Sequence, residues 1–159
     1  MREGRTSVYE YPQTVARAAA RRKVGVMTGL GEFPVAGVLR AEDIVRAKKF
    51  YAEVLGLKAI EAPGSGEGMG MYSAGGGTMV MIYERPGMPA PQNTTLGFGV
   101  ALDKFDEVIA DLRGKGVIFE DYDLPDIGLE TVDGVGDSGG AKVAWFKDTE
   151  GNIINIASM

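Results

Sequence analysis

The chain of 159 residues contains neither histidine nor cysteine. Without cysteine it cannot form disulfide bonds, bind a metal through thiolates or use a cysteine nucleophile. Without histidine it has no imidazole metal ligand and no Ser-His-Asp triad. Acid–base chemistry is left to Asp, Glu, Lys, Tyr or a bound water. These groups usually need burial or charged neighbours to titrate near pH 7.

Long apolar runs and a general basic charge are also missing. No apolar run approaches the roughly 20 residues that span a bilayer. Residues 1–26 hold six Lys/Arg and two Asp/Glu, a net charge of +4, whereas residues 27–159 hold eleven and twenty, a net charge of −9. An acidic body argues against nucleic-acid binding, which needs a basic footprint. We therefore expect a cytoplasmic protein with neither a membrane nor a nucleic acid as partner.

Residues 1–26 differ from the rest of the chain, because their segment 14–23 combines strong helix formers with little apolar periodicity. We interpret them as a basic N-terminal extension, either upstream of a natural start at Met27 or docked on the surface as a short helix. The alternative is a basic tail that contacts RNA, anionic lipid or a targeting receptor. Residues 27–159 have the length of one globular domain.

The body reads as two copies of one unit, at residues 33–86 and 94–159, joined by a proline-rich linker. The first copy predicts a strand at 35–40, a helix from Asp43 to Gly56, and strands near 57–61, 69–73 and 78–83. The second predicts a strand at 96–100, a helix from Lys104 to Gly114 or Gly116, strands at 117–120, 142–146 and 153–157, and an irregular segment at 121–140. This order indicates an α+β fold with two βαβββ repeats that form a curved mixed sheet around an interior pocket.

The glycine-rich stretch at 64–70 does not predict a nucleotide site. It lacks the Gly-x-x-x-x-Gly-Lys-Ser/Thr pattern and does not open a helix. A phosphate cradle needs backbone amides at a helix N-terminus. We expect hairpin turns and loops there instead.

Two motifs carry a family resemblance. The first is Asp148-Thr-Glu-Gly-Asn152, set between the apolar segments Trp145-Phe146 and Ile153-Ile154-Asn155-Ile156. The second runs from Asp43 to Phe50-Tyr51 and is followed by Leu55-Gly56-Leu57. Together they resemble the vicinal oxygen chelate superfamily, the glyoxalase, bleomycin-resistance and extradiol dioxygenase group. The resemblance implies the two-repeat fold, a pocket between the sheets and a homodimer.

The resemblance also implies where a metal would be held, on the first and last strand of each repeat. In this sequence the corresponding residues are Ala36, Met81, Thr95 and Asn155. Divalent transition metals prefer imidazole, thiolate or carboxylate ligands, and hard cations need several oxygens. We therefore predict no metal and no other cofactor. A metal site built from Glu84 or the acidic loop 121–137 is the alternative.

Side chains alternate across a strand, which predicts the pocket lining. Ala36, Val38 and Arg40 should share one face, as should Trp145 and Val143. The predicted ligand-binding residues are Arg40, Met79, Met81, Tyr83, Thr95, Trp145, Ile153 and Asn155. Methionine and tryptophan suit an apolar, planar ligand. The alternative is that Met79, Met81 and Trp145 fill the protein interior and leave no pocket.

Three functions fit this pattern. The first is a metal-independent binding protein that sequesters or carries an apolar, partly planar small molecule. The second is a metal-independent isomerase, lyase or cyclase on an activated carbonyl substrate. There Arg40 would steady an oxyanion, and Tyr83, Asp121 or Asp123 would move the proton. The third is a dimeric scaffold without a ligand.

Overall fold

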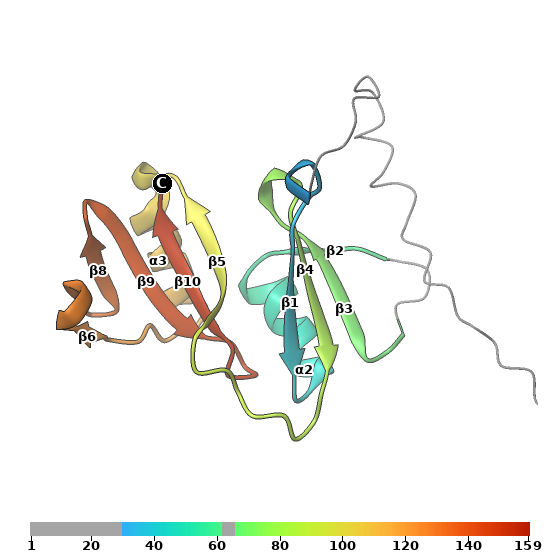
Figure 1. Cartoon of the computed structure of the whole chain (residues 1–159). Coiled ribbons are helices and arrows are strands. Elements are labelled where there is room, and N and C mark those ends of the chain that lie inside the picture. Colours follow the sequence, from blue (N-terminus) through green and yellow to red (C-terminus); the bar gives the residue numbers. More distant parts are fainter. Residues whose placement is uncertain (1–29, 62–65) are drawn as a thin grey trace, which may run out of the picture.

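The computed structural model describes residues 30–61 and 66–159, so the predicted 1–26 extension lies outside the described residues. Figure 1 shows the first repeat on the right and the second on the left. The first repeat contains η1 (Leu30–Glu32), β1 (Ala36–Ala41), α2 (Ile44–Lys49), the π-helical η2 (Phe50–Val54), β2 (Lys58–Ala59), β3 (Met69–Ser73), η3 (Gly75–Gly77) and β4 (Met79–Glu84). The second contains β5 (Thr94–Val100), η4 (Leu102–Lys104), α3 (Phe105–Gly114), β6 (Asp123–Leu124), η5 (Pro125–Ile127), β7 (Leu129–Val132), β8 (Val135–Ser138), β9 (Ala141–Lys147) and β10 (Ile153–Ser158).

The first repeat has the predicted βαβββ order. Asp43 caps α2, because its Oδ1 accepts hydrogen bonds from the amides of Val45 at 2.9 Å and Arg46 at 3.0 Å. These amides belong to the first helical turn, which has no backbone acceptors of its own. After η2, Gly56 turns the chain with a φ of 67°, a conformation that costs glycine little. Both predicted ends of the helical segment are confirmed.

The second repeat has more regular structure than expected. The prediction of an irregular segment at 121–140 is wrong, because β6, η5, β7 and β8 lie within it. Asp133 and Gly134 connect β7 to β8 with φ angles of 51° and 74°, the conformation of a two-residue Asp-Gly hairpin turn. The predicted strand at 117–120 is also wrong. That segment is held by an isolated bridge between Phe119 and Phe146.

The strands form two mixed sheets rather than one continuous sheet. Their orders are β1-β4-β3-β2 and β5-β10-β9-β8-β7-β6. The pairs β1–β4 and β5–β10 are parallel, and the others are antiparallel. The edge strands β1 and β5 lie next to each other at the centre of Figure 1. A Cβ at Gly37 would lie only 2.8 Å from Cδ1 of Leu96. The glycine on β1 therefore allows the Leu96 side chain of β5 to approach closely.

Both helical segments pack on the same side of the sheets, behind the strands in Figure 1. One hydrophobic core joins them, and its members include Ile44, Ala47 and Tyr51 from α2 and η2, Phe105, Ile109 and Leu112 from α3, and Leu39, Val80, Ile82, Phe146, Ile154 and Ile156 from the sheets. The α+β class with two related repeats is confirmed. Within residues 30–61 and 66–159, no helix has the length and apolar character to cross a membrane.

Candidate functional site

The sheet surface opposite the helices is called the open face here. In the first sheet it consists of Ala36, Val38 and Arg40 on β1, Met69 and Met71 on β3, and Met79, Met81 and Tyr83 on β4. Val38 lies directly opposite Met81, and Arg40 lies opposite Tyr83. Val38 is 52% exposed, so this apolar surface is accessible to solvent. The structure therefore brings the predicted residues of the first repeat onto one face.

In the second sheet the open face consists of Thr94 and Gly97 on β5, Trp145 and Lys147 on β9, and Ile153 and Asn155 on β10. Asn155 lies between Trp145 on one side and Gly97 on the other. Nε1 of Trp145 donates a hydrogen bond to Oγ1 of Thr94 at 3.2 Å. A Cβ at Gly97 would be 3.8 Å from Oδ1 of Asn155, an ordinary contact, so there is room beside the amide.

Thr95 lies at an irregularity of β5. The register shifts there, so that Thr94 is opposite Ile153 whereas Leu96 is opposite Ile154. The Thr95 hydroxyl donates to the carbonyl of Ile153 at 3.0 Å. The alternation of side chains breaks at a bulge of this kind. As a result Thr94, which was not predicted, makes the contact with Trp145.

Arg40 is largely engaged by the protein itself. Its Nη2 donates to the backbone carbonyl of Glu150 at 2.7 Å, and its Nη1 lies 3.5 Å from Oε2 of Glu42. The side chain is 11% exposed, and its buried Nε has no hydrogen-bond partner within the described part of the chain. Arg40 thus donates to a backbone carbonyl of the protein itself. Contact between Arg40 and a ligand stays a prediction.

The turn between β9 and β10 contacts the first repeat through a buried polar cluster. Oη of Tyr51 donates to Oδ2 of Asp148 at 2.7 Å, and Nδ2 of Asn152 donates to the same oxygen at 2.7 Å. Asn152 also donates to the carbonyl of Arg40 at 2.9 Å. Burial raises the pKa of Tyr51 well above its usual value, and the neighbouring Asp148 adds to this effect.

Glu150 of the second repeat accepts hydrogen bonds at the N-terminus of α2, which belongs to the first repeat. Its carboxylate is fully buried and accepts hydrogen bonds from the amides of Glu42 and Asp43, each at 2.9 Å. Arg46 donates to it through Nε at 2.8 Å and Nη2 at 2.9 Å. Burial acts to raise the pKa of Glu150, but the hydrogen bonds from Arg46 and Asp43 outweigh it and the pKa is lowered. The motif 148–152 therefore works mainly as a joint between the repeats.

Sequence reasoning missed three polar side chains beside Trp145. Glu120 accepts hydrogen bonds from Oη of Tyr122 at 2.8 Å and from Nζ of Lys147 at 2.6 Å. The rings of Tyr122 and Trp145 are 5.6 Å apart and nearly perpendicular. Burial and the bond to Glu120 raise the pKa of Tyr122 to about 12. Lys147 could have been found by strand alternation from Trp145, but Glu120 and Tyr122 lie in the segment that was misassigned.

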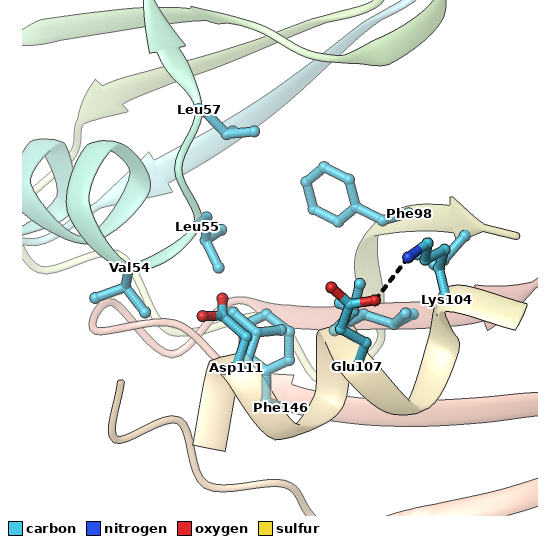
Figure 2. Close-up of a pocket in the computed structure, with 12 residues that line it drawn as sticks. Val54, Leu55, Leu57, Phe98, Lys104, Glu107, Asp111 and Phe146 are labelled. Carbon is cyan, nitrogen blue, oxygen red and sulfur yellow. Dashed lines mark hydrogen bonds and ion pairs between the residues drawn. The ribbon is translucent and has the colours of Figure 1, made fainter. Parts of the chain in front are cut away.

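An apolar groove of about 480 Å³ lies on the helix side of the sheets, between the end of η2 and α3. Figure 2 shows Leu55 and Leu57 on one side of this groove and Phe98 and Phe146 on the other, with Glu107 projecting from α3. None of the eight predicted ligand-binding residues lines it. The resemblance placed a pocket between the sheets, so this groove is a different feature.

The residues at the implied metal positions do not fit a divalent metal. Ala36 has no donor atom, and Met81 offers only a thioether. The Thr95 hydroxyl is bonded to Ile153, and Asn155 donates through Nδ2 to the carbonyl of Ala144 at 3.2 Å. Two neutral side-chain oxygens are too few for a hard cation. Within residues 30–61 and 66–159 there is also no cluster of three or more His, Cys, Asp or Glu residues that would hold one.

Two of the groups considered for proton transfer, Asp121 and Tyr83, have contacts within the protein. Oδ1 of Asp121 accepts hydrogen bonds from Oγ1 of Thr131 at 3.2 Å and from the amide of Gly134 at 2.7 Å, so it holds the β7–β8 hairpin. The Tyr83 ring lies 5.5 Å from Cζ of Arg85. These contacts favour structural roles for both residues.

Comparison with known proteins places this geometry in a family. The family model described as the Glyoxalase/Bleomycin resistance protein/Dioxygenase superfamily matches residues 34–156. No curated protein sequence matches the chain.

Three solved structures share the fold. A glyoxalase/dioxygenase from Nostoc punctiforme has a TM-score of 0.61 and 15% identity, with 86% of this chain and 98% of that chain covered. The oxidase ChaP-H2 has a TM-score of 0.59 and 20% identity, with 80% and 93% covered. The fosfomycin resistance protein FosX from Listeria monocytogenes has a TM-score of 0.55 and 16% identity, with 77% and 86% covered. With its repeated βαβββ units and a family match over most of its length, this chain belongs to the glyoxalase/bleomycin resistance protein/dioxygenase superfamily.

Proposed function

We propose that the protein is a metal-independent small-molecule binding protein, which sequesters or carries an apolar, partly planar ligand on the open face. The observation that carries the proposal is the composition of this face. Val38 and Met81 lie side by side in the first sheet, and Asn155 lies beside Trp145 in the second. Such a surface offers dispersion contacts, an aromatic ring for stacking and an amide for one hydrogen bond.

The methionines suit a binding surface better than a fixed catalytic site. Met69, Met71, Met79 and Met81 come from two neighbouring strands, with Met71 directly opposite Met81. All four are partly accessible rather than fully buried. Unbranched thioether side chains adapt to irregular ligand shapes. We extend the proposal to a homodimer, in which a second copy covers part of this exposed apolar surface.

Trp145 is the single tryptophan of the chain, so its fluorescence reports binding near it. The test titrates the full chain with planar aromatic compounds and follows Trp145 emission, with calorimetry as a second readout. Gly97→Phe should abolish binding, because its ring would occupy the space beside Asn155. The backbone of Gly97 is extended within β5 and its Cβ position is free of clashes, so this variant should fold.

Val108→Phe is the matched control, since it adds the same ring to the helix-side groove. Binding that persists in Val108→Phe and disappears in Gly97→Phe supports the open face as the site. The reverse pattern would move the ligand to the groove and contradict the proposal. Binding to the wild-type chain should be unchanged by a chelator, and sedimentation should report the mass of a dimer.

A further inference from the structure

The polar cluster beside Trp145, formed by Glu120, Tyr122 and Lys147, has hydrogen-bond donors that no described residue uses. Glu120 uses one oxygen for Tyr122 and the other for Lys147. A lysine ammonium has three N–H donors, and the bond to Glu120 occupies one of those of Lys147. Lys147 has no second hydrogen-bond partner among the residues that the structure describes, and its side chain is 52% exposed. Donors are therefore available at this end of the open face.

The ion pair between Glu120 and Lys147 adds little to the stability of the fold. Exposed ion pairs contribute little to stability, and the Lys147 side of this pair is open to solvent. The segment that carries Glu120 is already held by its own amide, which donates to the carbonyl of Trp145 at 2.8 Å, and by the bridge between Phe119 and Phe146. The Glu120–Lys147 ion pair is therefore not needed to hold this segment in place.

The arrangement next to the indole ring points to a particular ligand chemistry. The polar edge of Trp145 is fixed by Thr94, and Tyr122 lies perpendicular to the indole at 5.6 Å. Because Glu120 balances the charge of Lys147, the cluster is neutral overall. For a carboxylate ligand, the attraction of Lys147 is offset by repulsion from Glu120, so the cost of desolvating the anion is not repaid. A neutral acceptor avoids that cost, and the cluster therefore favours it.

We propose that Glu120, Tyr122 and Lys147 form a polar subsite that selects planar aromatic ligands with an uncharged carbonyl oxygen at the ring edge. The inference rests on the function proposed above, since it assumes that the aromatic ring binds on the open face beside Trp145. The ring contacts Trp145, and the carbonyl oxygen accepts a hydrogen bond from Nζ of Lys147. Glu120 and Tyr122 position the ammonium group.

The test uses three probes of the same shape, 2-acetylnaphthalene, 2-isopropylnaphthalene and 2-naphthoate, titrated into the full chain by calorimetry and Trp145 fluorescence. The acetyl probe should bind about tenfold more tightly than the isopropyl probe, as expected for one hydrogen bond to a charged donor. In Lys147→Met, which keeps the apolar stem, this ratio should fall to about one. In Glu120→Gln, which frees the charge of Lys147, affinity for 2-naphthoate should rise about tenfold.

Lys115→Met is the control, because it removes an exposed lysine that lies away from the open face. Nζ of Lys115 is 2.7 Å from Oδ2 of Asp111, a residue of α3. It should change none of the three affinities. Equal binding of all probes, with no effect of Lys147→Met, would overturn the subsite and leave the proposed function standing. Failure of every probe to bind the wild-type chain would overturn both. Unfolding curves check that each variant is folded.

Discussion

Arg46 of the first repeat and Glu150 of the second form an ion pair with 2.8 Å between Nε and Oε1, although 104 positions separate them in the chain. The same carboxylate accepts the amides of Glu42 and Asp43. A buried acid of the second repeat thus completes the start of the first repeat's helix. The stability of that helix depends on the docking of the two repeats.

Glu150→Gln should therefore destabilise the protein by about 2–3 kcal/mol, because hydrogen bonds to a charged acceptor are lost and an amide NH₂ group would face backbone donors. The partial exposure of Arg46 keeps the cost below that of a fully buried pair. Urea unfolding at neutral pH measures the effect. Glu107→Gln, which removes an exposed ion pair with Lys104, should change stability by less than about 0.5 kcal/mol.

Acid should weaken the same joint. The pKa of Glu150 is lowered in the folded protein relative to its usual 4.5, so its contribution is present above that value. The contribution is lost as the pH falls through the lowered pKa. Urea midpoints of the wild type and Glu150→Gln, measured between about pH 3 and pH 7, should converge toward the acid end. A difference that stays constant over this range would contradict the assignment.

Tyr51→Phe should destabilise the protein by about 1–3 kcal/mol, because it removes the 2.7 Å hydrogen bond to the buried Asp148. The pKa of Tyr51 is raised in the folded state, so its contribution is full below the usual value of 10 and is lost as the pH rises above it. Thermal unfolding at alkaline pH should show a steeper loss for the wild type than for the variant. Parallel curves would argue against this role.

Gly134→Ala and Gly139→Ala form a matched pair at the two turns around β8. Both glycines have positive φ, 74° and 66°. A Cβ at Gly134 would lie 2.3 Å from Cβ of Phe119, whereas one at Gly139 meets nothing within 4 Å. Gly139→Ala should therefore lower the free energy of unfolding by about 1–2 kcal/mol through backbone strain. Gly134→Ala should lower it further, because it adds the clash with Phe119. Equal unfolding midpoints for the two variants would show that the Phe119 contact is unimportant.

The first repeat was predictable because its signals are local. Asp43 and Gly56 mark the helical segment by capping chemistry, and the strands follow an alternating pattern. The hairpin at Asp133-Gly134 also carried a local signal, an Asp-Gly pair between valines. The high glycine and acidic content of 121–140 is typical of a loop and outweighs this short turn signal in the sequence.

The site was less predictable, because its geometry depends on distant contacts. Alternation placed Met81, Trp145 and Asn155 on the open face, in agreement with the strand register. It failed at Thr95, since the bulge there arises from pairing with β10 rather than from the sequence of β5. The engagement of Arg40 by Glu150 and of Lys147 by Glu120 likewise required the tertiary structure.

The joint at Glu150 has a consequence for biosynthesis. As the ribosome extends the chain, the first repeat emerges long before residue 150, and its helix start then lacks the acceptor that Asp43 and Glu42 use in the finished fold. Contacts between such distant positions form late and slow folding. We expect the early half of the nascent chain to stay incompletely ordered until the final hairpin arrives, which makes chaperone contact during translation most valuable in that interval.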